Sequence, residues 1–232
     1  MTAVKMYPFD PDIGSPVFNE YTDPAMADRV VHFVGRRRGN TLLPANVRHL
    51  SAQERLTNIL TTGGLHGYPV YRSDDVAVTC ASDLCSAELE TAFAKGLNSR
   101  GPLEPWALVL DRPTAWTYGF RPVVYADAAV FDAHKVALNA IHGPGGSALA
   151  VRTELGRDDW TAEREWRKFF PPGAPPLALD LRGTDVIAAV IVGQTGWAPA
   201  LPWTSTSFPP MRWLWDAAQR RLVHDGRIPF RP

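Results

Sequence analysis

The sequence predicts a single α+β domain with a split or mixed β-sheet core and a few short helices. Short segments with strand character are spread along the chain, and only a few segments show helical periodicity. The chain holds 21 prolines, which limit helix length, and eight tryptophans, which favour a sheet-rich core. Its 232 residues, 45% of them hydrophobic and 21% charged, are enough to bury a core of ordinary globular composition.

The predicted organisation begins with an extended leader over residues 1–28, in which prolines occur among acids and aromatics. Residues 29–232 then form the α+β domain. Its first element is a strand at Arg29–Gly35, made of β-branched and aromatic residues and ended by the glycine. The following Arg36-Arg37-Arg38-Gly39-Asn40 is a basic turn, either a solvated loop or a loop that faces a phosphate.

The clearest helix is predicted at Ser51–Thr62. Ser51 and Glu54 have the spacing of a capping box, in which each side chain caps the backbone of the other residue. Apolar residues follow at helical spacings of three and four, and Gly63-Gly64 ends the helix.

The remaining elements alternate between short strands and helices. Strands are expected at Val76–Cys80, Trp106–Asp111, Pro122–Ala126 and Asp185–Gly193. The last of these is the most apolar run in the chain, so we expect it to be a central strand.

Two further helices and a C-terminal hairpin complete the prediction. The helices are expected at Ser86–Gly96, capped by Ala81-Ser82-Asp83, and at Ala128–Ile141. Arg112-Pro113 is expected to be a turn. The segments near the C-terminus predict edge strands or a final hairpin, with Asp225-Gly226 as the turn signal.

Charge and cysteine content exclude several classes of protein. The 24 basic and 24 acidic residues cancel, which argues against a nucleic-acid binder that relies on a broad basic surface. Two cysteines cannot form a disulfide framework or a four-ligand zinc site, and the histidines show no metal-binding spacing. No window approaches a membrane-spanning length of apolar residues, and we expect a cytoplasmic protein with no membrane contact.

The segment Trp160–Phe170 concentrates charge between large aromatic rings. It predicts a strand, and alternation along that strand would place Glu163, Glu165 and Arg167 on one side. Such a run is either a solvated face or one wall of a site.

The order of the elements resembles the ADP-ribosyltransferase fold, as found in bacterial toxins that modify nucleic acid and in phage-resistance (abortive-infection) proteins. The resemblance rests on the strand Val31-His32-Phe33, the helix and stop at Arg55–Leu65, the strand Val78–Ser82 and the late Arg164-Glu165-Trp166. The chain departs from the family at Val34, where those toxins carry a threonine.

The resemblance implies a catalytic role for Glu165, assisted by Glu163. ADP-ribosyltransferases cleave the bond between nicotinamide and ribose in nicotinamide adenine dinucleotide (NAD), through an oxocarbenium-like cation. A carboxylate beside the ribose stabilises that cation and holds the 2′-hydroxyl. In the family, the earlier of two such acids orients or deprotonates the acceptor.

The resemblance also implies a binding site for NAD, used as a substrate. His32 would bind the adenosine ribose in a cleft shared with Glu165, and Tyr125 would stack on the nicotinamide. Arg36 and Arg37 would meet the pyrophosphate through charge-assisted hydrogen bonds.

These inferences predict an NAD-dependent ADP-ribosyltransferase-like protein of toxin or phage-defence biology, acting on a macromolecular acceptor, either nucleic acid or protein. Two alternatives stay open. One is a non-catalytic binding module on the same fold, working with a cognate toxin or antitoxin partner through its tryptophans. The other is a metal-dependent nuclease that uses Glu163, Glu165 and an aspartate.

Overall fold

The computed structural model describes residues 29–34, 47–69, 76–96, 102–153, 161–170, 177–178, 187–200 and 210–228. Two expectations lie outside the described residues: the leader at residues 1–28, and the basic turn with Arg36 and Arg37.

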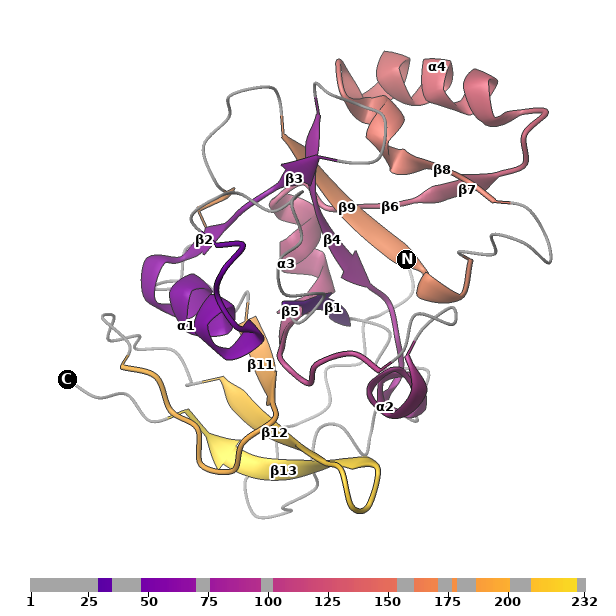
Figure 1. Cartoon of the computed structure of the whole chain (residues 1–232). Coiled ribbons are helices and arrows are strands. Elements are labelled where there is room, and N and C mark those ends of the chain that lie inside the picture. The colour runs from indigo at the N-terminus through magenta and orange to yellow at the C-terminus, as the bar shows by residue number, and fades with distance from the viewer. Residues whose placement is uncertain are drawn as a thin grey trace, which may run out of the picture.

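A mainly antiparallel sheet of nine strands, counted over the described residues, organises the domain. Its hydrogen-bonded order is β13 (Arg221–Arg227), β12 (Met211–Asp216), β11 (Ile187–Val192), β5 (Ala107–Asp111), β1 (Arg29–Phe33), β4 (Ala77–Ser82), β9 (Glu165–Phe170) and β6 (Arg121–Pro122), with β3 (Tyr68–Pro69) beside β4. The pairing of β11 with β12 is parallel, so the sheet is mixed (Figure 1). The predicted α+β class and mixed sheet are confirmed, and the apolar run at β11 is an interior strand as expected.

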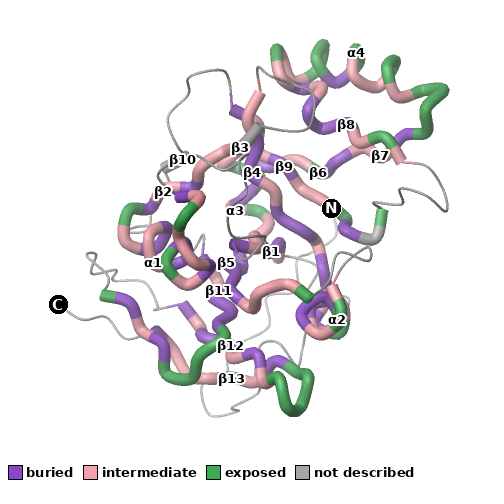
Figure 2. Tube along the Cα trace, in the orientation of Figure 1, coloured by how far each residue is buried: buried purple, intermediate pink, exposed green. Residues whose placement is uncertain are grey.

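Helices cover both faces of this sheet. On one side, α1 (Ala52–Thr62) and α3 (Arg112–Thr117) pack on the sheet, and on the other lies α2 (Ser86–Lys95). The first cluster contains Leu56 of α1 and Ala115 of α3, and the second contains Leu89 of α2. We call these two sides the α1 face and the α2 face; Figure 2 shows the buried strands between them.

Helix α1 is capped as the sequence predicts. The Ser51 hydroxyl accepts from the backbone N–H of Glu54 at 3.2 Å, and the Ser51 N–H donates to the Glu54 carboxylate at 2.6 Å. Gly63 closes the helix with φ 70°, a left-handed conformation that glycine adopts without steric cost.

Several boundaries differ from the prediction. Helix α2 is capped at Cys85 rather than at Asp83, because the Cys85 N–H donates to the Glu88 carboxylate at 2.8 Å. The expected turn at Arg112-Pro113 is instead the first turn of α3, capped by the Asp111 carboxylate, and proline fits that position without losing a hydrogen bond.

The C-terminal hairpin is confirmed, but its turn is elsewhere. Strands β12 and β13 pair antiparallel across a turn at residues 217–220. Asp225-Gly226 lies within β13, where the register shifts between Met211 and Trp213 of β12. A bulge there lets the Asp225 carboxylate accept from Arg212 Nε at 2.8 Å.

A small unit lies beside the main sheet. The predicted strand Pro122–Ala126 is split, because β6 joins β9 whereas β7 (Val124–Ala126) pairs in parallel with β8 (Ala150–Arg152). Between β7 and β8 run α4 (Phe131–His142) and a 3₁₀ turn, η3 (Gly146–Leu149), with α4 beginning three residues later than expected. Leu138, Leu149 and Ala150 form its buried cluster, against which Phe169 of β9 packs. A second short pair joins β2 (Gly64–Leu65) to β10 (Leu177–Ala178).

Candidate functional site

The backbone of the predicted site segment, Trp160–Phe170, is not one continuous strand but is interrupted at Arg164. Residues Thr161–Glu163 form a 3₁₀ turn, η4, and β9 begins only at Glu165. Arg164 between them has φ 39°, a left-handed value that side-chain-bearing residues seldom adopt. The expectation that Glu163 and Glu165 lie on one side of a single strand is therefore wrong, because the two residues lie on either side of Arg164, a residue with a strained backbone.

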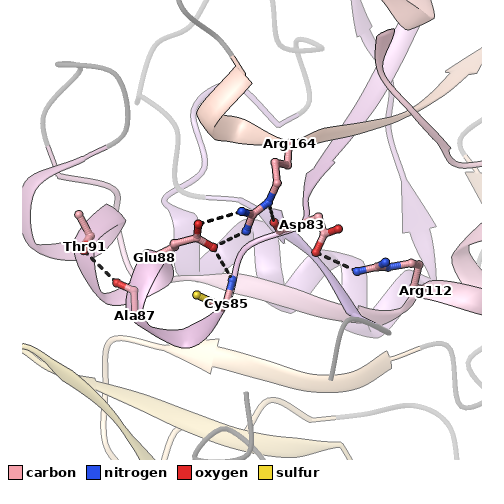
Figure 3. A network of polar contacts seen from close by, with 7 residues as sticks. All are labelled: Asp83, Cys85, Ala87, Glu88, Thr91, Arg112 and Arg164. Atoms are coloured by element: carbon pink, nitrogen blue, oxygen red, sulfur yellow. Dashed lines mark hydrogen bonds and ion pairs between the residues drawn. The ribbon is translucent and has the colours of Figure 1, made fainter. Parts of the chain in front are cut away.

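Tertiary contacts hold Arg164 in this conformation. The Arg164 carbonyl accepts from the Asp83 N–H at 3.1 Å, and its Nε donates to the Asp83 carbonyl at 2.5 Å. Its guanidinium also forms two hydrogen bonds with the Glu88 carboxylate, one of them 2.9 Å long (Figure 3). Arg112 completes the network through an ion pair with the Asp83 carboxylate at 2.8 Å. Strain of this kind costs on the order of 1–3 kcal/mol and is concentrated at functional sites.

The pKa values of the two acids in this network, Asp83 and Glu88, are shifted in opposite directions. Burial raises the pKa of Asp83, and the charges of Arg112 and Arg164 offset that rise only in part. Burial also acts to raise the pKa of Glu88. The hydrogen bonds from Arg164 and Cys85 outweigh it, so the pKa of Glu88 lies below its ordinary value. The ion pair between Glu88 and Arg164 therefore joins two charged groups and links α2 to the residue before β9.

Glu165 forms an ion pair with Arg167 on the α2 face. Arg167 Nη2 donates to Glu165 Oε2 at 2.8 Å, and the two side chains are only 10% and 11% exposed. Arg167 also donates to the Ala148 carbonyl of η3 at 2.7 Å. This second bond fixes the guanidinium, so Glu165 is held in one position by a cation that is itself anchored.

Tyr125 lies against the same carboxylates. The Glu165 backbone N–H donates to the Tyr125 hydroxyl oxygen at 2.8 Å. Burial, together with the nearby charges of Glu165 and Glu163, raises the pKa of Tyr125 to about 12. Glu163 itself is only 4% exposed. The structure therefore brings Glu163, Glu165 and Tyr125 together, as the resemblance implies, with Arg167 beside Glu165.

His32 lies on the other face of the sheet. Val31 is opposite Ser82, and Ser82 is opposite Glu165, so these side chains share the α2 face. His32 follows Val31 and projects to the α1 face, where its Nδ1 lies 2.6 Å from the Cys80 carbonyl oxygen. The expectation that His32 and Glu165 share a cleft is contradicted by this register.

Alternation along the predicted strand placed Arg167 on the same side as the two glutamates, and Arg167 does form an ion pair with Glu165. The bond from Arg167 to the Ala148 carbonyl was not predicted, because it depends on a turn nineteen residues away along the chain. The Asp83–Glu88 segment was interpreted as a helix start. The acids Asp83 and Glu88 were the only sequence signal for the ion pairs that they form with Arg112 and Arg164.

Chemically, the cluster offers carboxylates of low exposure beside a tyrosine hydroxyl and one fixed guanidinium. Carboxylates so placed stabilise a developing positive charge and hold a sugar hydroxyl. Among the described residues, no group of three or more His, Cys, Asp or Glu side chains has the geometry of a metal site, so the two glutamates have no third ligand there.

None of the described helices is long and apolar enough to cross a membrane. Comparison with protein-family models, curated proteins and solved structures found no match to this chain.

Proposed function

We propose that the chain is an NAD-dependent ADP-ribosyltransferase-like enzyme whose reaction centre lies at the start of β9. The observation that carries the proposal is the pair of weakly exposed carboxylates, Glu163 and Glu165, on either side of the strained Arg164. The resemblance of the chain to ADP-ribosyltransferases supports the same assignment.

In the proposed reaction, the bond between the ribose C1′ and the nicotinamide nitrogen breaks, and nicotinamide leaves with the bonding electrons. The Glu165 carboxylate stabilises the oxocarbenium-like ribose and accepts a hydrogen bond from its 2′-hydroxyl. An acceptor nucleophile then bonds to C1′ and loses its proton to Glu163. Tyr125, whose hydroxyl stays protonated to high pH, supplies an aromatic wall for the nicotinamide.

The proposal assigns no catalytic step to His32, because its side chain lies on the α1 face. The phosphate-binding role of Arg36 and Arg37 stays a prediction.

The proposal is tested with the purified chain and NAD. Nicotinamide release is followed by chromatography, and the melting temperature is measured with and without NAD. At about 100 times its dissociation constant, NAD should add about 2.7 kcal/mol, or about 5–10 °C for a chain of this size. If NAD gives no nicotinamide release and no shift in melting temperature, the proposal is wrong.

The binding-module alternative is favoured by one observation. Arg167 already neutralises Glu165, which suits a structural ion pair as well as a catalytic acid. The C-terminal tryptophans do not add to this alternative, because Trp197, Trp213 and Trp215 are buried in the core. Trp203 lies outside the described residues. Co-purification of a stoichiometric partner, with no turnover of NAD, would favour the binding module.

A further inference from the structure

The edge of the sheet at β6 holds two cations that no described acid neutralises. Among the described residues, ion pairs join acids to other arginines and to Lys135, but not to Arg121 on β6 or to Lys168 on the neighbouring β9. Arg121 instead donates from Nη1 to the backbone carbonyls of Trp116 and Phe120, each at 2.7 Å. These two bonds hold the guanidinium at the C-terminal end of α3.

Gly119 allows Lys168 to come close to Arg121. Gly119 has φ 87°, and a Cβ at this position would lie 2.9 Å from Lys168 Nζ and 3.3 Å from its Cδ. The lysine side chain therefore lies against the backbone two residues before Arg121. Burial, and to a smaller extent the charge of Arg121, lowers the pKa of Lys168. Two like charges held close together repel each other, so an anion bound between them would relieve this repulsion.

The Arg121 guanidinium keeps a pair of donors for such an anion. Nη1 is occupied by the two carbonyls, whereas no described residue accepts from Nε or Nη2. The N–H groups of Nε and Nη2 point in parallel from one side of the planar group, and they match two oxygens of a carboxylate or a phosphate. The edge at β6 can therefore bind an oxyanion through two hydrogen bonds, with the Lys168 ammonium as the second charge.

An exposed indole ring lies beside these donors. The Arg121 guanidinium carbon is 3.9 Å from the centroid of the Trp116 ring. Trp116 is 48% exposed, and it is the only exposed tryptophan or phenylalanine among the described residues. Trp166 supports it in an edge-to-face contact, with ring centroids 6.2 Å apart. A ring held in this way, next to a guanidinium, is a stacking surface for a nucleotide base. We call Trp116, Arg121 and Lys168 the β6 patch.

We propose that the β6 patch binds a nucleoside monophosphate, with the phosphate between Arg121 and Lys168 and the base stacked on Trp116. A phosphate monoester carries a charge of about −1.5 to −2 at pH 7, which two cations neutralise, whereas a carboxylate would leave one of them without a partner. Because every base has an aromatic face, stacking on Trp116 selects no particular base.

The β6 patch is separate from the proposed NAD site. Side chains alternate along β9, and Trp166 packs against the core cluster of the α1 face. Lys168 shares that face with Trp166, whereas Glu165 and Arg167 lie on the α2 face. Nucleotide binding at the β6 patch therefore does not depend on the proposed reaction.

Isothermal titration calorimetry of the full chain with guanosine 5′-monophosphate tests the proposal, because NAD contains no guanosine. The matched probes are ribose 5-phosphate, which lacks the base, and guanosine, which lacks the phosphate. The nucleotide should bind at least about five-fold more tightly than either probe, since base stacking and charge-assisted hydrogen bonds both contribute. No binding of the nucleotide at millimolar concentration, or equally tight binding of either probe, overturns the proposal.

Substitutions locate the binding site, after thermal unfolding has shown that each variant is folded. Lys168→Gln and Arg121→Gln should each raise the dissociation constant for guanosine 5′-monophosphate by about ten-fold or more. The matched control is Lys135→Gln, because Lys135 is also a lysine near an aromatic ring, with its Nζ 5.5 Å from the Phe131 centroid. That control should leave nucleotide binding unchanged, and equal effects of Lys168→Gln and Lys135→Gln would contradict the assignment. Lys168→Gln should also leave any nicotinamide release from NAD unchanged, so the outcome is separate from that of the proposed function.

Discussion

Substitution of Arg167 by methionine tests whether the ion pair with Glu165 stabilises the fold around the candidate site. The side chains are 10% and 11% exposed, so the change leaves Glu165 weakly hydrated and without its cation. Breaking a buried pair in this way costs about 3–5 kcal/mol. That range includes the loss of the hydrogen bond to the Ala148 carbonyl. Methionine keeps the packing of the arginine stem, so lost packing adds little to the cost.

The assay is urea unfolding followed by tryptophan fluorescence, at pH 7. The matched control is Lys135→Met, which removes a cation from an exposed pair whose Nζ–Oδ1 distance is 4.0 Å. That control should change the free energy of unfolding by less than about 0.5 kcal/mol. Adding Glu165→Gln to Arg167→Met should recover part of the loss, because no buried charge then remains. If Arg167→Met costs no more than Lys135→Met, the reasoning about this buried pair is wrong.

Two further predictions concern the packing of α4 and the ionisation of Tyr125. A Cβ at Gly146 would lie 2.3 Å from the Leu138 carbonyl oxygen, so Gly146→Ala should destabilise by at least about 2 kcal/mol in thermal unfolding. Gly196→Ala, with no atom near its Cβ, should cost only about 1 kcal/mol of backbone strain, and equal losses would contradict the packing argument. Burial raises the pKa of Tyr125 from its ordinary value of 10.0 to about 12, so the stabilising effect of the protonated hydroxyl is complete below pH 10 and is lost as pH rises towards 12. Unfolding measured from pH 9 to 12 should show that fall, and Tyr125→Phe should flatten it; an unchanged profile in the variant would count against this assignment.

Local signals in the sequence predicted local structure well. The capping box of Ser51 and Glu54 and the stop at Gly63 identified α1 almost to the residue, because both act within a few residues of the chain. The apolar run at β11 was recognised as an interior strand because burial on both faces leaves an unbroken hydrophobic pattern.

The site was harder to predict, because its geometry depends on contacts between distant segments. Arg164 adopts its left-handed conformation where Asp83 and Glu88 hold it, and the strand pattern of its neighbours does not reveal that. The face on which His32 lies follows from two strand pairings, and a sequence gives no direct measure of register. The resemblance nevertheless named Glu163, Glu165 and Tyr125, which the structure places near one another.

The apolar outer side of α4 shows a different limit of sequence reading. The sequence predicted a helix at Ala128–Ile141, but both of its sides carry apolar residues, and the pattern alone does not say which side packs on the domain. The structure resolves this through Leu138, which lies against Leu149 while Val136 remains exposed.

The most direct test of the proposed function compares NAD turnover by Glu165→Gln and His32→Ala with that of wild type. Nicotinamide release is measured under the same conditions, after thermal unfolding has shown that each variant is folded. The proposed site predicts that Glu165→Gln loses at least about 100-fold in turnover. It predicts that His32→Ala, altered on the opposite face of the sheet, stays within about two-fold of wild type. Turnover that survives Glu165→Gln but is lost in His32→Ala would contradict the assignment of the reaction centre to the start of β9.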